Sequence, residues 1–294
     1  TDAVLEPSYI CEALGLQGRL DYMQRDMSSF IEMKSGKADE YAIRGKVEPK
    51  ENNRVQMLLY QAVLEYAMGK EHHRVKPYLL YTRYPLLYPA RPSWAMLRRV
   101  MDVRNRIVAN EYGIQLRNSL QYTAERLRDI APGTLNERQL DNTLWKRYLY
   151  PSIDAVTQKI HALSPLEQSY FYALYNFITK ELYTSKSGDV EYEGRTGASA
   201  LWLATLEDDL AIRQNCAADI HKPYLLLERT HTDIDTLPNF RQGDAIVLYE
   251  RNVSEDNVTN KMVFKGNIEE ISDCNIRIRL RAAQQNARVL PMES

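Results

Sequence analysis

Two short segments constrain this chain more than any other feature of its sequence. Residues 15–21 and 30–36 alternate apolar and polar side chains, and a polar stretch at 25–28 separates them. Alternation with a period of two residues predicts β-strands, and a polar break between two such strands predicts a turn. The sequence therefore predicts a β-hairpin centred on the bond between Asp26 and Met27.

The predicted hairpin brings two carboxylates together. Its register places Asp21 opposite Glu32 on one face, and Lys34, two residues after Glu32, shares that face. Two carboxylates about 5 Å apart repel each other. A divalent cation between them removes the repulsion, because Mg²⁺ and Mn²⁺ prefer oxygen ligands. A neighbouring lysine can orient water or stabilise charge on a phosphate, so the pattern indicates a metal-dependent phosphodiesterase.

The alternative interpretation is an exposed strand face with solvated charges, and a register shift of one residue would turn Glu32 to the other face. The next segment favours the catalytic interpretation. Residues 53–66 carry an apolar stripe at helical spacing, which predicts an amphipathic helix. Gln56 and Tyr60 are four residues apart in this segment, so they lie together beside the stripe.

This combination resembles the motifs of RecB-type nucleases, which belong to the PD-(D/E)XK superfamily. A Gly-x-x-Gly-x-x-Asp segment ends at Asp21, and a Glu-x-Lys-Ser-Gly segment begins at Glu32. The Gln-x-x-x-Tyr pair is formed by Gln56 and Tyr60. The motif-level resemblance covers residues 15–84.

The resemblance implies a role for each matching residue. Asp21, Glu32 and the backbone carbonyl of Met33 would bind Mg²⁺ or Mn²⁺, and Lys34 would be catalytic. The glutamine–tyrosine pair would line the DNA side of the site. Members of this family usually take a further metal ligand, His or Glu, from a helix upstream of the first strand. No such helix fits before residue 15, so we expect that ligand to lie outside this chain. Glu6 is the acid that best approaches the site from that side, and we expect it to be a strand-surface acid rather than the missing ligand.

The resemblance also implies an architecture of α+β or α/β class. It predicts a mixed-sheet, restriction-endonuclease-like core with flanking helices at 1–130, a helical arm at 131–234 and a small β-barrel at 235–294. This order resembles the DNA replication and repair helicase–nucleases, in which arm and barrel connect the nuclease to a superfamily 1 motor. The chain has no Gly-x-x-x-x-Gly-Lys-(Ser/Thr) phosphate loop, so a helicase would lie after Ser294 in the parent chain.

Several local patterns predict elements outside the hairpin. Helical spacing predicts helices over 94–130 and 198–217, and charged residues predict an exposed loop over 37–52. Ser164, followed by proline and then by Glu167, predicts a capped helix that runs to about residue 184. Its aromatic and aliphatic stripe predicts a buried face formed by Tyr170, Phe171, Leu174, Phe177 and Ile178.

The pattern of the last segment predicts short strands, over 245–249, 261–271 and 275–281. In the last of these, apolar residues face one way. Arginines face the other way, at Arg277, Arg279 and Arg281. Three arginines on one strand face can follow a phosphate backbone, or they can simply keep an outer face soluble.

Composition limits the classes of function. The net charge of −1 excludes a global basic field, so any DNA binding must use a local patch. Cys11, Cys216 and Cys274 are widely spaced, which predicts neither a disulfide framework, nor structural zinc, nor the four-cysteine iron–sulfur cluster of many relatives. We therefore expect a cytoplasmic protein, associated with the nucleoid if bacterial. No apolar run is long enough for a membrane span, and no signal peptide is visible.

Three hypotheses follow for the function. The leading one is a Mg²⁺- or Mn²⁺-dependent deoxyribonuclease acting on single-stranded or flap DNA, as part of a helicase–nuclease. The second is a catalytically silent DNA-binding clamp, because an upstream metal ligand is missing. The third is a structural connector for a helicase.

Overall fold

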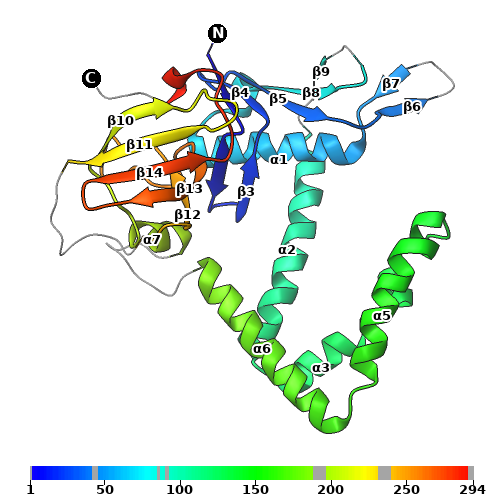
Figure 1. Ribbon diagram of the computed structural model, residues 1–294. Coiled ribbons are helices and arrows are strands. Elements are labelled where there is room, and N and C mark those ends of the chain that lie inside the picture. The colour runs from blue at the N-terminus through cyan, green and yellow to red at the C-terminus, as the bar shows by residue number, and fades with distance from the viewer. Residues whose placement is uncertain are drawn as a thin grey trace. The chain divides into compact units, whose positions relative to one another are not determined.

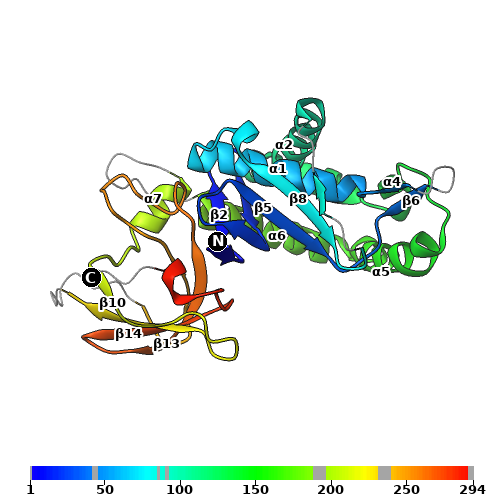
Figure 2. The ribbon, with the colours of Figure 1, turned by 90° about the horizontal axis from the view of Figure 1, so that it is seen from above.

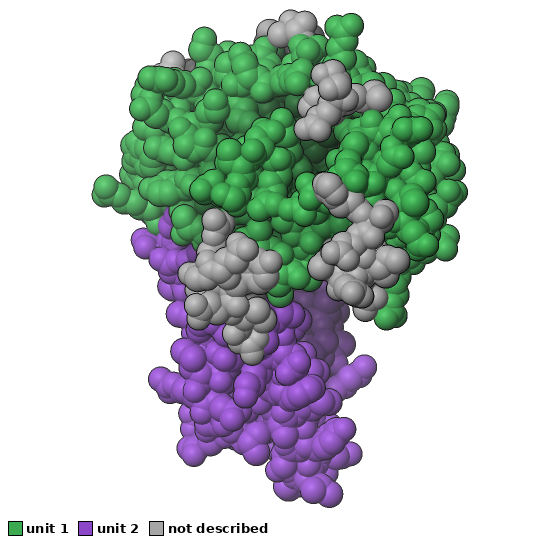
Figure 3. Space-filling model, turned by 90° about the vertical axis from the view of Figure 1, so that its left-hand side faces the viewer, with its two compact units in different colours: residues 1–100, 190–294 green, residues 101–189 purple. Residues whose placement is uncertain are grey.

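The computed structural model describes residues 2–41, 46–84, 87–89, 93–187, 197–230 and 240–290. Within these residues the chain is of mixed α+β class, as expected. It divides into two compact units, one formed by residues 1–100 with 190–294 and the other by residues 101–189 (Figure 3).

The first sheet of the larger unit is mixed. Its five strands lie in the order β1-β4-β5-β8-β9, and only the β5–β8 pair is parallel (Figure 1). The bounds of these strands are Ala3–Leu5 (β1), Tyr22–Gln24 (β4), Ser29–Lys34 (β5), Lys76–Tyr81 (β8) and Leu87–Pro89 (β9). The two central strands, β5 and β8, run side by side, and the chain crosses between them through a helix.

The hairpin has the predicted register but a shorter first strand. Tyr22 pairs with Ile31 and Met23 pairs with Phe30, so the hairpin is centred where the sequence places it. Residues 15–21 are not part of β4. Instead, β3 (Leu16–Arg19) pairs with β2 (Ser8–Cys11), and the chain then turns into β4 just after position 21.

Helix α1 (Glu51–Met68) covers this sheet, as predicted, but its buried face is shifted from the predicted stripe. Leu58, Ala62 and Val63 of that stripe are buried, whereas Tyr66 is exposed. It packs on β2, β3 and β8 (Figure 2). Met57 and Leu64 on this helix are completely buried. The helix ends at Gly69, whose φ of 64° is left-handed and favours glycine. Burial of these side chains against Phe30 and Leu79 forms the core on which α1 is fixed.

The segment expected to be an exposed loop, 37–52, forms a small hairpin. Strand β6 (Asp39–Tyr41) pairs with β7 (Lys46–Glu48), and the residues between them lie outside the described ranges. The loop prediction was wrong because it relied on charge alone, and charged side chains do not prevent backbone pairing in a two-stranded ribbon. After α1, the short 3₁₀-helix η1 (His72–Arg74) leads into β8.

The smaller unit is helical. The segment predicted as one helical stretch, 94–130, is two helices, α2 (Trp94–Arg117) and α3 (Leu120–Arg128). The break lies at Asn118, which has a φ of 43°, and Ser119 then caps α3 by accepting the Tyr122 N–H at 3.3 Å. The remaining elements are α4 (Pro132–Leu135), the π-helix η2 (Trp145–Leu149), α5 (Tyr150–His161) and α6 (Pro165–Ser187).

The predicted start of α6 is confirmed, but its buried face is not. Glu167 accepts the Ser164 backbone N–H at 2.8 Å, and Ser164 Oγ accepts the Glu167 N–H at 3.4 Å, which completes a capping box. The prediction of a buried aromatic stripe was wrong, because these side chains are 42–71 % exposed at Tyr170, Leu174, Phe177 and Ile178. Another face of α6 contacts α3, where the buried Thr123 hydroxyl donates a hydrogen bond to the Asn176 side chain.

The second sheet of the larger unit begins earlier than expected. Of the helix predicted over 198–217, only α7 (Ala198–Leu203) is helical. The five strands of this sheet are antiparallel, in the order β10-β11-β14-β13-β12. Their bounds are Leu210–Cys216 (β10), Tyr224–Arg229 (β11), Ala245–Leu248 (β12), Phe264–Ile271 (β13) and Asn275–Leu280 (β14).

This arrangement changes the expected domain boundaries. The helical unit starts at residue 101 rather than 131, and the second sheet starts at residue 210 rather than 235. Strands β10 and β12 lie at its two edges, and no pairing joins them in the described part of the chain. The described strands form a five-stranded antiparallel sheet, and the closed barrel expected over 235–294 stays a prediction. None of the helices in the described ranges combines the length and the apolar character needed to cross a lipid bilayer.

Candidate active site

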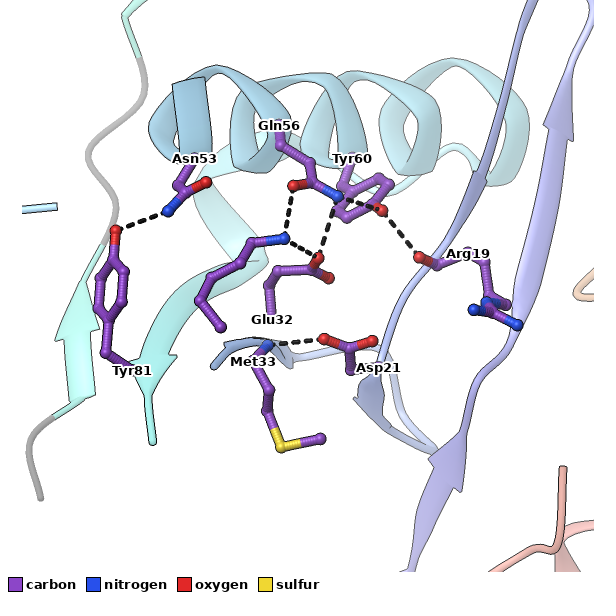
Figure 4. Close-up of polar contacts among 9 residues, drawn as sticks. Arg19, Asp21, Glu32, Met33, Asn53, Gln56, Tyr60 and Tyr81 are labelled. Carbon is purple, nitrogen blue, oxygen red and sulfur yellow. Dashed lines mark hydrogen bonds and ion pairs between the residues drawn. The ribbon is translucent and has the colours of Figure 1, made fainter. Parts of the chain in front are cut away.

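The five side chains that the sequence predicts as catalytic lie together where the first sheet meets its covering helix α1 (Figure 4). Asp21 lies directly before β4, Glu32 and Lys34 lie on β5, and Gln56 and Tyr60 lie one helical turn apart on α1. The strand period places Glu32 and Lys34 on the face that α1 covers.

A continuous hydrogen-bond network joins the helix to the strands. Lys34 Nζ donates to Glu32 Oε1 at 2.7 Å and to Gln56 Oε1 at 2.8 Å. Gln56 Nε2 donates to the same Glu32 oxygen at 3.0 Å and to the Tyr60 hydroxyl at 2.8 Å. The Tyr60 hydroxyl in turn donates to the backbone carbonyl of Arg19 at 2.8 Å. Gln56 therefore orients both the acid and the lysine, and Tyr60 orients Gln56.

Asp21 is held by the strand that it faces in the hairpin register. Its Oδ2 accepts the Met33 backbone N–H at 2.7 Å, at the position where β4 no longer supplies a partner. The N–H and C=O of one strand residue point to the same edge of that strand. The Met33 carbonyl therefore lies on the edge of β5 that faces Asp21.

Glu32 is the most unusual group of the site. Its side chain is only 5 % exposed, and its Oε2 has no hydrogen-bond partner among the described residues. Burial raises the pKa of Glu32, the hydrogen bond from Lys34 opposes that shift, and the neighbouring Asp21 carboxylate raises the pKa further. A buried carboxylate oxygen without a donor is costly unless the group takes up a proton or a cation approaches it.

These oxygens fit a hard divalent cation. Glu32 Oε2, the Asp21 carboxylate and the Met33 carbonyl are the ligand types that Mg²⁺ and Mn²⁺ take. No cluster of three or more His, Cys, Asp or Glu side chains with metal-binding potential occurs among the described residues, so a cation here would have two carboxylate ligands from this part of the chain. Glu6, the acid expected from the upstream side, pairs with Arg19 at 2.9 Å instead.

Three supporting residues of the site were not predicted as such from the sequence. Asn53 Nδ2 donates to the buried hydroxyl of Tyr81 at 2.7 Å, which ties the start of α1 to β8. Gly18 allows the Tyr60 ring to approach, because a Cβ there would lie 2.8 Å from Tyr60 Cε1. The sequence held a signal for Asn53 alone: it lies three residues before Gln56 and therefore shares the helix face that meets the site.

The three arginines expected to contact DNA belong to the second sheet. They alternate with the buried apolar residues of β14, as predicted. Arg277 stacks on the Tyr224 ring at 4.0 Å from the ring centroid, and Arg279 donates to Glu269 at 3.2 Å. Arg281 lies just after the strand and lines a pocket. Two of the three are thus engaged by protein groups on the outer face of the sheet.

The burial of Tyr60 determines its protonation. Burial raises the pKa of the Tyr60 hydroxyl, while the hydrogen bond from Gln56 lowers it. The phenol is therefore protonated at neutral pH and acts as the donor to the Arg19 carbonyl.

The site combines paired acidic oxygens, an oriented lysine and two polar side chains on a helix. Such a set can hold a cation against a phosphate and place a positive charge beside it. Comparison with protein-family models and with curated proteins finds no match to this sequence.

Proposed function

We propose that this protein is a metal-dependent deoxyribonuclease of the PD-(D/E)XK superfamily, acting on single-stranded or flap DNA. The observation that supports it most is the buried, unpartnered Oε2 of Glu32, beside Asp21 and the Met33 edge of β5. A restriction-endonuclease-like core is consistent with the parallel β5–β8 pair covered by α1. The motif order of RecB-type nucleases accounts for Asp21, Glu32 and Lys34 on the strand side of the site and for Gln56 and Tyr60 on the helix.

Asp21, Glu32 and the Met33 carbonyl would hold the cation. Bound Mg²⁺ or Mn²⁺ would supply Lewis-acid stabilisation of phosphate charge and lower the pKa of water. Lys34 Nζ, fixed between Glu32 and Gln56, would place a positive charge beside the scissile phosphate. Exclusion of water around Glu32 strengthens each of these interactions.

A direct assay tests this proposal. Labelled single-stranded DNA should be cleaved in the presence of Mn²⁺ or Mg²⁺, and EDTA should abolish cleavage. The Lys34→Gln variant, which keeps the side chain polar and removes the charge, serves as the inactive control. Cleavage that persists in EDTA would contradict the proposal.

A second candidate function is supported by one observation. The described residues supply only two carboxylates at this site, so the same surface can act as a DNA clamp without cutting. The two functions differ in one measurement. A clamp binds single-stranded DNA with the same affinity in EDTA and in Mn²⁺ and never shortens it.

Gln56→Ala is expected to lower the single-turnover cleavage rate at saturating DNA by about tenfold, with the free energy of unfolding changed by no more than about 0.5 kcal/mol. The reason is that Gln56 orients Lys34 and Glu32 but contributes little to the core. Single-turnover cleavage with excess Mn²⁺, paired with a thermal melt, measures both quantities.

The matched control is Asn52→Ala, which removes an exposed amide from the same helix. It should cleave at the wild-type rate. Tyr60→Phe should act in the same direction as Gln56→Ala but less, because the ring stays and only the hydroxyl is removed. Wild-type cleavage by Gln56→Ala would show that the network is structural.

A further inference from the structure

A pocket of the larger unit lies where the N-terminal strands meet the second sheet. Ser8 and Val263 exchange backbone hydrogen bonds of 3.0 and 2.9 Å, which joins β2 to the segment before β13. The Arg281 N–H donates to the Lys265 carbonyl at 3.0 Å, which closes the other side. Polar side chains that line the pocket are Glu6, Ser8, Arg19, Lys265, Arg281 and Gln284.

Ser8, one of the residues that line the pocket, has a buried hydroxyl with no partner among the described residues. Ser8 is 2 % exposed, and its Oγ makes no hydrogen bond to any described residue. Most buried hydroxyls in proteins are paired, so an orphaned one on a residue that borders a pocket indicates a missing acceptor or donor. An oxyanion would accept its hydrogen bond.

The charges around this hydroxyl favour an anion. Arg19, Lys265 and Arg281 line the pocket, against one carboxylate, Glu6. Glu6 is engaged by Arg19 at 2.9 Å. In the described part of the chain, neither Lys265 nor Arg281 forms an ion pair. Two cations beside an orphaned hydroxyl are the ingredients of a phosphate site.

The pocket is linked to the candidate active site through one residue. The Arg19 carbonyl accepts the hydrogen bond of the Tyr60 hydroxyl (Figure 4), and Arg19 is also one of the residues that line the pocket. Arg19 therefore belongs both to the hydrogen-bond network of the candidate active site and to the lining of the pocket.

We propose that this pocket, lined by Ser8, Lys265 and Arg281, binds a phosphate group of the DNA strand that is cut. This inference rests on the proposed nuclease function, because it assigns the substrate a second contact. The phosphate is either an internal phosphodiester or a terminal 5′-phosphate. Both present the same oxyanion to Ser8 and the two cations.

The first test measures DNA affinity without cleavage. Fluorescence anisotropy with a labelled oligothymidylate in EDTA should show about tenfold weaker binding for the variant with both Lys265→Gln and Arg281→Gln. The dependence of log affinity on log salt should become shallower by about 0.7 for each phosphate that the variant no longer neutralises. Arg213→Gln, which removes an exposed cation from β10 in the same sheet, should bind like wild type.

Ser8→Ala separates binding from folding. Removing an unpartnered hydroxyl should leave the melting temperature unchanged or raise it, because the protein gives up no hydrogen bond. DNA affinity should nevertheless fall several-fold if the hydroxyl holds a phosphate. An affinity equal to that of wild type for Ser8→Ala and for the double variant would overturn the proposal.

Two further measurements identify the source of the phosphate and keep the two proposals distinct. Tighter binding of a 5′-phosphorylated oligonucleotide than of its 5′-hydroxyl form would support a terminal phosphate, and equal binding would support an internal one. Inorganic phosphate should raise the melting temperature of the wild-type protein, but not of the double variant, relative to sodium chloride at equal ionic strength. If Mn²⁺ gives no cleavage but these shifts occur, the nuclease proposal fails and the pocket stands. If cleavage occurs without them, the pocket fails alone.

Discussion

Asp21→Asn is expected to lower the rate of DNA cleavage about a thousandfold or more. Loss of a carboxylate ligand removes metal-assisted charge stabilisation worth several kcal/mol, and about 1.4 kcal/mol corresponds to a factor of ten. Asparagine is the informative substitution because its amide oxygen can still accept the Met33 N–H at the end of the hairpin. Single-turnover cleavage with excess Mn²⁺ measures the rate, and a melt confirms that the fold is retained.

The matched control for this variant is Asp26→Asn in the turn of the same hairpin. Asp26 is exposed, and its Oδ1 accepts the Ser28 N–H at 2.9 Å. It therefore makes the same kind of hydrogen bond to the backbone as Asp21 but lies outside the candidate active site. It should cleave at the wild-type rate. Near-native cleavage by Asp21→Asn would remove Asp21 from the catalytic site.

Glu32→Gln is expected to abolish both cleavage and stabilisation by metal. A cation that binds only the folded state at about 100 times its dissociation constant raises the free energy of unfolding by about 2.7 kcal/mol. The wild-type protein should show this increase with Mn²⁺, and Glu32→Gln should not. Chemical denaturation with Mn²⁺ and with EDTA measures the effect independently of any activity.

The dependence of stability on pH provides a further check on Glu32. Its pKa is raised in the folded protein, chiefly by burial. Between the unfolded value, about 4.3, and the raised value, the folded state keeps a proton that the unfolded state loses. The metal-free protein should therefore lose stability as pH rises through this window, and Glu32→Gln should flatten that dependence. An unchanged slope in the variant would show that Glu32 titrates normally.

Local periodicity determined a large part of the first sheet. The alternation on both sides of the turn fixed the register of Tyr22 with Ile31, because a shift by one residue would turn every buried side chain outward. The apolar stripe predicted α1, and the Ser164–Glu167 pair predicted the start of α6. In each case the signal lies within a few residues, so the sequence carries it directly.

Local periodicity did not reveal which segments become partners. The segment 15–21 has one alternating pattern, yet it breaks before β4 because β2 pairs with β3. Strands β10 and β11 were missed for the same reason, since β11 is stabilised by pairing with β10 and β14. Alternation identifies a strand only when one of its faces is buried, and burial depends on distant elements.

The same division applies to the candidate site. The sequence by itself determined that Asp21 and Glu32 lie in register and that Gln56 and Tyr60 share a helical face. Only the tertiary structure placed that face over β5, so that Lys34 and Gln56, 22 residues apart in the chain, form a hydrogen bond. Tertiary packing alone also buried Glu32, because exclusion of water depends on helix α1 packing over the face of β5 that carries Glu32, and no local pattern encodes that packing.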